Sequence, residues 1–132
     1  MKDFNSQWLM SRMAKEKAAQ CHPELHGVPH DAVEYESTLH DDIIDACRQR
    51  GWIVIHSRMD VPTTTAKGVC DFIIFASRSR VFLFECKNKN NKLTDEQRGF
   101  AMMADMLGFT VHVVRAFSEF LQVINQPEST TP

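Results

Sequence analysis

Three residues whose types and spacing could do chemistry border two short apolar runs of this chain. Asp71 precedes the run Phe72–Ala76, whereas Glu85 and Lys87 follow the run Val81–Phe84. Short runs rich in Phe, Ile and Val, separated by a polar break, predict the two strands of a hairpin. A hairpin folds Asp71 toward the end where Glu85 and Lys87 lie. Neighbouring carboxylates suit a hard cation such as Mg²⁺, and a lysine beside them suits phosphodiester hydrolysis. The alternative is a surface hairpin with an ordinary Glu–Lys pair.

The register of this hairpin decides whether the three side chains share a face. Glu85 and Lys87 are two residues apart, so both leave the same face of a strand. A two-residue turn at 78–79 would place Asp71 opposite Cys86 and separate the carboxylates. We therefore predict an odd-length connection or a bulge between the strands.

A long helix is predicted before the hairpin, over Asp31–Arg50, with Asp31 and Glu34 in a capping arrangement. Glu36 lies two turns before Ile43 and points to the same side, whereas Glu34 comes out on the opposite side. A carboxylate on an apolar stripe needs a partner, which a metal site would provide. The alternative for Glu36 is a solvated position at the helix end. The predicted inward stripe contains Leu39, Ile43, Ala46 and Cys47.

The other segments predict a mixed sheet with helices on its faces. Gly51 ends the first helix, and Trp52–His56 is expected to be a central strand because it is apolar throughout. The polar loop 57–68 is long for a compact domain and could hold DNA. A last strand is predicted at 109–115 and a short helix at 118–124.

Gln97 has two possible roles in the helix predicted at Asp95–Leu107. With Thr94 it forms a capping box, which explains it structurally. It also lies one turn before Phe100 on the inward stripe, which aims it at the strand ends. The two roles can share one residue, and we expect Gln97 to reach the site.

Length and composition predict one globular domain. The chain has 132 residues, 43% of them apolar and 24% charged, with a net charge of −2. It contains neither a signal-peptide core nor the ~18–20 apolar residues of a membrane span. The four cysteines form no C-x-x-C pair, and Cys21, His22, His26 and His30 complete no zinc-ligand spacing. We expect a reduced, cytoplasmic protein without structural zinc.

Basic residues gather around the hairpin although the net charge is slightly negative. They are expected to form a rim for a phosphate backbone around the metal site. A solvated run of charges is the alternative. The predicted DNA-binding residues are Arg58, Lys67, Arg78, Arg80, Lys89 and Lys92.

The spacing of Asp71 and the Glu85-Cys86-Lys87 triplet resembles the core of PD-(D/E)XK nucleases, where an Asp opens one strand and E-x-K lies on the next. From position 36 to position 123 the chain resembles the VRR-Nuc branch of that superfamily. The matching pieces are a helix Glu, G-W at 51–52, G-x-x-D at 68–71, E-C-K at 85–87, K-L-T-D-E-Q at 92–97 and V-H-V-V-R at 111–115. Cys70 stands where a proline is common, and His40 where Gln is common.

The resemblance implies a restriction-endonuclease-like α/β fold and metal-dependent hydrolysis of DNA. It implies that Asp71, Glu85 and the Cys86 carbonyl bind Mg²⁺ or Mn²⁺, with Glu36 completing the site directly or through water. Lys87 would position or deprotonate the attacking water. The implied catalytic residues are Glu36, Asp71, Glu85, Lys87 and Gln97.

Stand-alone members of this branch look like phage or bacterial structure-specific nucleases of replication, repair or recombination, some acting on four-way junctions as dimers. An apolar stripe outside the resemblance predicts an N-terminal amphipathic helix. We therefore expect a homodimer that cuts branched DNA in a bacterial or phage-infected cell. The alternatives are a non-catalytic DNA-binding module on the same fold and a restriction-type duplex endonuclease. The expected parts are helix and linker at 1–30, nuclease domain at 31–125 and a disordered tail at 126–132; the stripe is Phe4, Trp8, Leu9 and Met13.

Overall fold

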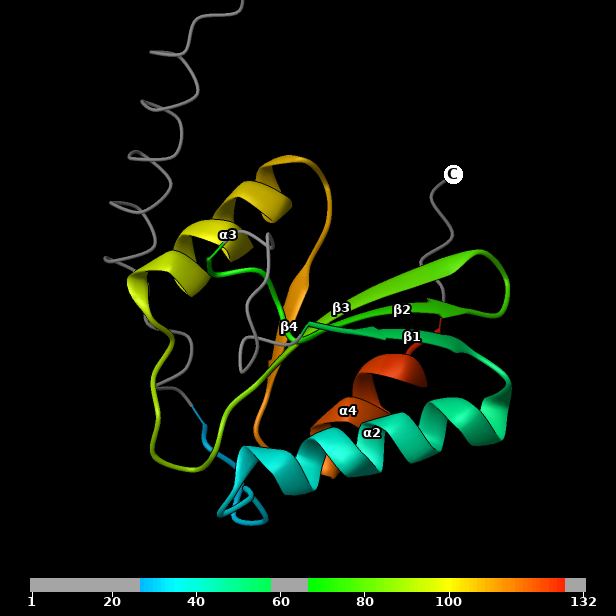
Figure 1. Ribbon diagram of the computed structural model, residues 1–132, viewed down its shortest axis with the longest axis horizontal. Helices are drawn as coiled ribbons and strands as arrows, with labels where there is room; N and C mark the ends of the chain where they lie inside the picture. Colours follow the sequence, from blue (N-terminus) through cyan, green and yellow to red (C-terminus); the bar gives the residue numbers. More distant parts are fainter. Residues whose placement is uncertain (1–26, 58–66, 128–132) are drawn as a thin grey trace, which may run out of the picture.

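The computed structural model describes residues 27–57 and 67–127, whose arrangement is shown in Figure 1. The predictions for the N-terminal helix, for Arg58 and most of its loop, and for the end of the C-terminal tail lie outside these residues. No helix in the described part is long and apolar enough to cross a membrane. The elements, in chain order, are α2 (Glu36–Arg50), β1 (Ile53–His56), β2 (Phe72–Ala76), β3 (Arg80–Cys86), α3 (Asp95–Met106), β4 (Val111–Val114) and α4 (Phe117–Ile124).

The strands form a four-stranded mixed sheet in the order β1-β2-β3-β4. The β1–β2 and β2–β3 pairs are antiparallel, and the β3–β4 pair is parallel because α3 crosses between those strands. Helices α2 and α4 lie against one face of the sheet and α3 lies on the other side (Figure 1). The predicted class, a mixed α/β sheet flanked by helices, is confirmed.

The hydrophobic core lies between the sheet and the layer of α2 and α4. Phe72, Phe84 and Phe120 are fully buried there, and the rings of Phe84 and Phe120 lie 4.9 Å apart. The buried residues of α2 are the four predicted ones, Leu39, Ile43, Ala46 and Cys47. The helical stripe that orients Glu36 is therefore confirmed.

Helix α2 begins later than predicted, at Glu36, so the predicted cap at Asp31 is wrong. The backbone of Val33 explains the difference, because it pairs with two distant segments. Its N–H donates to the Arg115 carbonyl at 2.7 Å, and its carbonyl accepts from the Lys89 N–H at 2.9 Å. These groups are consequently not available to a helix turn.

Strand β1 is an edge strand, so the prediction that it lies in the sheet centre is wrong. Ile53 is 63% exposed and Ile55 is 49% exposed. These two residues face away from α2 and α4, which lie against the other face of the sheet. An apolar run of this length does not distinguish a strand covered on both faces from one covered on a single face.

The hairpin connection contains three residues, Ser77–Ser79, because Ala76 pairs with Arg80. The predicted odd-length connection is therefore confirmed. Arg78 and Ser79 both adopt left-handed backbone conformations, with φ of 60° and 58°. The pairing of Phe72 with Phe84 extends by one residue to place Asp71 opposite Glu85.

Candidate functional site

The Asp71 side chain is bonded to the backbone at the end of β3, next to Glu85. The Cys86 N–H donates to Oδ2 of Asp71 at 2.8 Å. The backbone N–H of Asp71 acts in the opposite sense to burial, because it lowers the pKa of the Glu85 carboxyl group. The two carboxyl groups therefore occupy one end of the hairpin, as the register requires.

The Glu85 carboxyl group is buried in a negatively charged environment. Glu85 as a whole is only 3% exposed. Burial, followed by the negative charge of Asp71, raises the pKa of Glu85 to about 8, whereas Lys87 acts to lower it. The neighbouring cation therefore does not compensate the carboxylate fully, and a further positive charge here would stabilise the ionised form.

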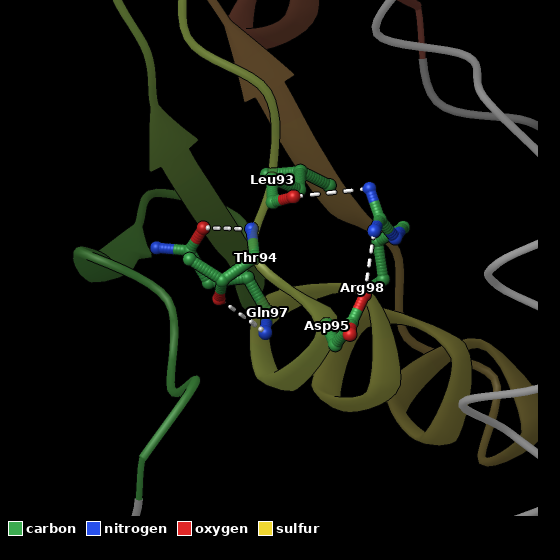
Figure 2. Close-up of polar contacts among 5 residues, drawn as sticks. All are labelled: Leu93, Thr94, Asp95, Gln97 and Arg98. Carbon is green, nitrogen blue, oxygen red and sulfur yellow. Dashed lines mark hydrogen bonds and ion pairs between the residues drawn. The ribbon is translucent and has the colours of Figure 1, made fainter.

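Gln97 performs both roles that the sequence allows it. Its Oε1 accepts from the Thr94 N–H at 2.9 Å, and the Thr94 hydroxyl accepts from the Gln97 N–H at 3.2 Å, which closes a capping box (Figure 2). The remaining amide nitrogen points away from Thr94 and donates to Oε1 of Glu85 at 2.7 Å. The start of α3 is thus bonded directly to the end of β3.

A glycine brings the chain before Asp71 against the start of α3. Gly68 has a φ of +85°, and a Cβ on it would overlap the backbone carbonyl of Glu96. Only a residue without a side chain permits this approach. The contact places the approach to Asp71 beside the helix turn that carries Gln97.

Glu36 and Glu34 differ as the helical phase predicts. The half-buried Glu36 is close enough for its charge to raise the pKa of Glu85. The Glu34 side chain is 63% exposed and lies 2.6 Å from the Lys89 ammonium. Glu36 therefore faces the site, whereas Glu34 belongs to a surface ion pair.

His40 lies in this region although it was not among the predicted site residues. Its Nε2 lies 3.6 Å from Oδ2 of Asp71. One ligand atom each from His40, Asp71 and Cys86 lies within 4.8 Å of the others, and neither Glu36 nor Glu85 belongs to this cluster. His40 follows Glu36 by four residues, so the helical phase that placed Glu36 could also have found His40.

The predicted basic rim divides into two groups. Lys67 precedes Gly68, Lys89 follows Lys87, and Lys92 precedes Thr94. All three lysines are exposed and lie at the site end of the hairpin. Arg78 and Arg80 lie at the opposite end, separated by the length of β2, about 17 Å. Arg80 contacts the rings of Trp52 and Phe82, and its NH1 donates to the Ile124 carbonyl at 3.0 Å. The structure therefore does not bring these two arginines to the site.

Several of the predicted catalytic residues thus come together at one end of the sheet. Glu85 is 3% exposed and Lys87 is 7% exposed, so a nearly buried carboxyl group in β3 and a nearly buried ammonium just after it lie two residues apart. No family model, curated protein or solved structure matches this chain.

Proposed function

We propose that this protein is a Mg²⁺- or Mn²⁺-dependent deoxyribonuclease on a restriction-endonuclease-like fold. The observation that carries the proposal is the placement of Asp71 opposite Glu85 at one end of the hairpin, with Lys87 directly after the last residue of β3. The resemblance to VRR-Nuc nucleases supports the same conclusion from the sequence.

The donor set fits a hard divalent cation. Asp71 and Glu85 supply carboxylate oxygens, and burial followed by the charge of Asp71 raises the pKa of Glu85 to about 8, an effect that a bound cation would offset. The Cys86 N–H faces the Asp71 carboxylate, and in an extended strand the carbonyl of the same residue leaves along the same edge. The Cys86 carbonyl is therefore the further ligand that we propose. When bound, the ion polarises the scissile phosphate and lowers the pKa of a bound water.

Lys87 is the residue that we propose contributes a positive charge to the reaction. The residue follows the end of β3, is only 7% exposed, and is close enough to Glu85 to act on the pKa of that carboxyl group. We assign its ammonium to offsetting the negative charge that develops on the phosphate. Its Nζ also positions the attacking water by a hydrogen bond, or accepts the water's proton when neutral.

Gln97 and Glu36 complete the proposed site as supporting residues. Gln97 fixes Oε1 of Glu85 through the 2.7 Å hydrogen bond, which orients the carboxylate and supports the water beside Lys87. Glu36 adds a carboxylate from α2, acting on the metal directly or through a water. Each residue comes from a different element, so the fold assembles the site.

The proposed substrate is branched DNA bound by a homodimer. The family resemblance points to replication, repair or recombination, and paired cuts in a four-way junction suit two sites related by a two-fold axis. We assign phosphate contacts to the exposed residues Lys67, Lys89 and Lys92, so we expect binding that weakens steeply with salt. Light scattering at micromolar concentration tests the dimer.

A cleavage panel tests the function. Labelled single-stranded, duplex, flapped and four-way DNAs are incubated with Mg²⁺, Mn²⁺ or EDTA, using wild-type protein and the Asp71→Ala and Lys87→Ala variants. We expect metal-dependent cleavage of branched DNA that Asp71→Ala abolishes together with metal binding. Lys87→Ala should retain metal binding and lose rate. DNA binding without cleavage under every condition would instead favour a non-catalytic module, and equal rates on linear duplex would favour a restriction-type enzyme.

A further inference from the structure

A cluster of one imidazole, one carboxylate and one thiol lies on the core side of Asp71. His40 comes from α2, Asp71 precedes β2, and Cys86 ends β3, yet their ligand atoms lie within 4.8 Å of one another. This set of donors differs from the carboxylate pair of Asp71 and Glu85, because it offers nitrogen and sulfur as well as oxygen.

The His40 Nε2 atom has no hydrogen-bond partner and is buried. Its distance to Oδ2 of Asp71, 3.6 Å, is too long for a hydrogen bond. A buried nitrogen without a partner costs free energy, so its position calls for an explanation. Two donors at about 2.1 Å from a tetrahedral ion are about 3.4 Å apart, which is close to the separation found here.

Aromatic packing holds the His40 ring in this orientation. The ring lies edge-on to His56, with centroids 4.8 Å apart, and edge-on to Phe72 at 5.3 Å. The His56 ring stacks on Phe72 at 4.4 Å, so the three rings form one packed group. The imidazole is therefore positioned before any ligand arrives.

We propose that His40, Asp71 and Cys86 form a binding site for a transition-metal ion of the Zn²⁺ type. The ligands are His40 Nε2, Asp71 Oδ2 and Cys86 Sγ, and the thiol proton passes to solvent as the sulfur–metal bond forms. Nitrogen and sulfur donors favour Zn²⁺ and Co²⁺ over Mg²⁺, which prefers oxygen ligands alone. The largest separation in the cluster must shorten by about 1 Å to reach tetrahedral geometry.

Occupation of this site would regulate cleavage, a consequence that rests on the proposed function. Asp71 is a ligand in both sites, so an ion bound with His40 and Cys86 withdraws it from the Mg²⁺ pair. Zn²⁺ is therefore an inhibitor that acts without blocking Lys87 or Glu85. His40 gives the site its selectivity and takes no part in the proposed catalysis.

Cobalt substitution in the full-length, metal-free protein tests the site. Titration with Co²⁺ alone should produce a thiolate-to-cobalt charge-transfer band and the intense visible bands of tetrahedral cobalt, and Zn²⁺ should displace them. Cys86→Ala should abolish the charge-transfer band. His40→Gln should weaken Co²⁺ and Zn²⁺ binding by at least about tenfold. Cys21→Ser, which removes the cysteine beside the N-terminal histidines, is the matched control and should change nothing.

The outcomes separate the two proposals. No charge-transfer band in the wild type, or a band that survives Cys86→Ala and disappears with Cys21→Ser, overturns the site. Should Cys86→Ala fail to fold by circular dichroism, unchanged affinity in His40→Gln overturns it instead. A cobalt band in a protein that cleaves no DNA would retain this site and remove the nuclease. If cleavage is found, Zn²⁺ should inhibit the Mg²⁺ reaction, and His40→Gln should require about tenfold more Zn²⁺; equal inhibition of the two proteins would contradict the regulation.

Discussion

The side-chain amide of Gln97 donates to Oε1 of Glu85 at 2.7 Å while its own oxygen accepts from the Thr94 N–H at 2.9 Å. One side chain therefore joins the first turn of α3 to the buried carboxylate of β3. The capping box and the site share this amide, so a change at Gln97 affects both. Substitutions at Thr94 and Gln97 can nevertheless separate the two roles.

Thr94→Ala is expected to lower stability and leave the cleavage rate unchanged. Gln97→Glu should lower the cleavage rate and leave stability nearly unchanged. Thr94→Ala removes the hydroxyl that caps α3 and should cost about 1 kcal/mol. A glutamate at 97 can still close a capping box, but it places a carboxylate against Glu85. We expect Gln97→Glu to reduce cleavage by at least about tenfold. Urea unfolding and cleavage assays on the same samples measure the two effects. If stability and cleavage rate fell together in both variants, the two roles would not be separable.

The sequence predicted the hairpin register because the period of a strand is strict. Asp71 can share a face with Glu85 only if the connection has an odd length or a bulge intervenes, and the three-residue connection satisfies that condition. The stripe of α2 was predictable for the same reason, since four apolar residues define the phase of the helix. Local periodicity therefore determined both the register and the direction of Glu36.

Long-range contacts determined the features that the sequence did not predict. The start of α2 depends on Val33, whose backbone bonds to Arg115 and Lys89. The approach of Gly68 to Glu96 likewise joins segments that are distant in the sequence. Arg80 was assigned to the DNA rim from its charge, although Trp52 and Phe82 hold it at the other end of the sheet. No local pattern contains these pairings.

Glu85→Gln should stabilise the metal-free protein at alkaline pH. The folded carboxyl keeps its proton up to a pKa of about 8, whereas the unfolded chain releases it near 4.5. The folded state therefore binds more protons between these values, and its stability is full below 4.5 and falls as pH rises through 8. A glutamine carries no such charge. We therefore expect the variant to be more stable than the wild type by about 2 kcal/mol at the alkaline end of this pH interval.

Urea unfolding in EDTA at several pH values measures this difference. Wild-type stability should decline across the interval, and that of Glu85→Gln should decline less. Addition of Mg²⁺ should recover wild-type stability at alkaline pH and leave the variant unchanged, because the variant has lost a ligand. Parallel pH profiles for the two proteins would show that burial of Glu85 is compensated by other groups.

Glu36→Gln is expected to impair cleavage far more than Glu34→Gln. Glu36 is near enough to influence the pKa of Glu85, so its loss removes a carboxylate from the site. We expect a loss of roughly tenfold. Glu34 forms a surface pair with Lys89 and has a side chain 63% exposed, so its loss should change stability by no more than about 1 kcal/mol and leave the rate within about twofold. Equal, small effects on the rate would mean that Glu36 is a solvated helix-end residue.

Gly68→Ala should damage the protein more than Gly108→Ala, although both glycines have positive φ. Their φ values are +85° and +91°, so an alanine at either position adopts a similarly strained backbone, at a cost of about 1–2 kcal/mol. Gly108 has open space where a Cβ would lie, whereas Gly68 faces the carbonyl of Glu96. The overlap must move the approach to Asp71 or the first turn of α3, which we expect to cost a further ~1–3 kcal/mol. Because that turn carries Gln97, cleavage by Gly68→Ala should also fall at a temperature where both variants are folded. Equal destabilisation, with equal rates, would show that the contact with Glu96 does not position the site.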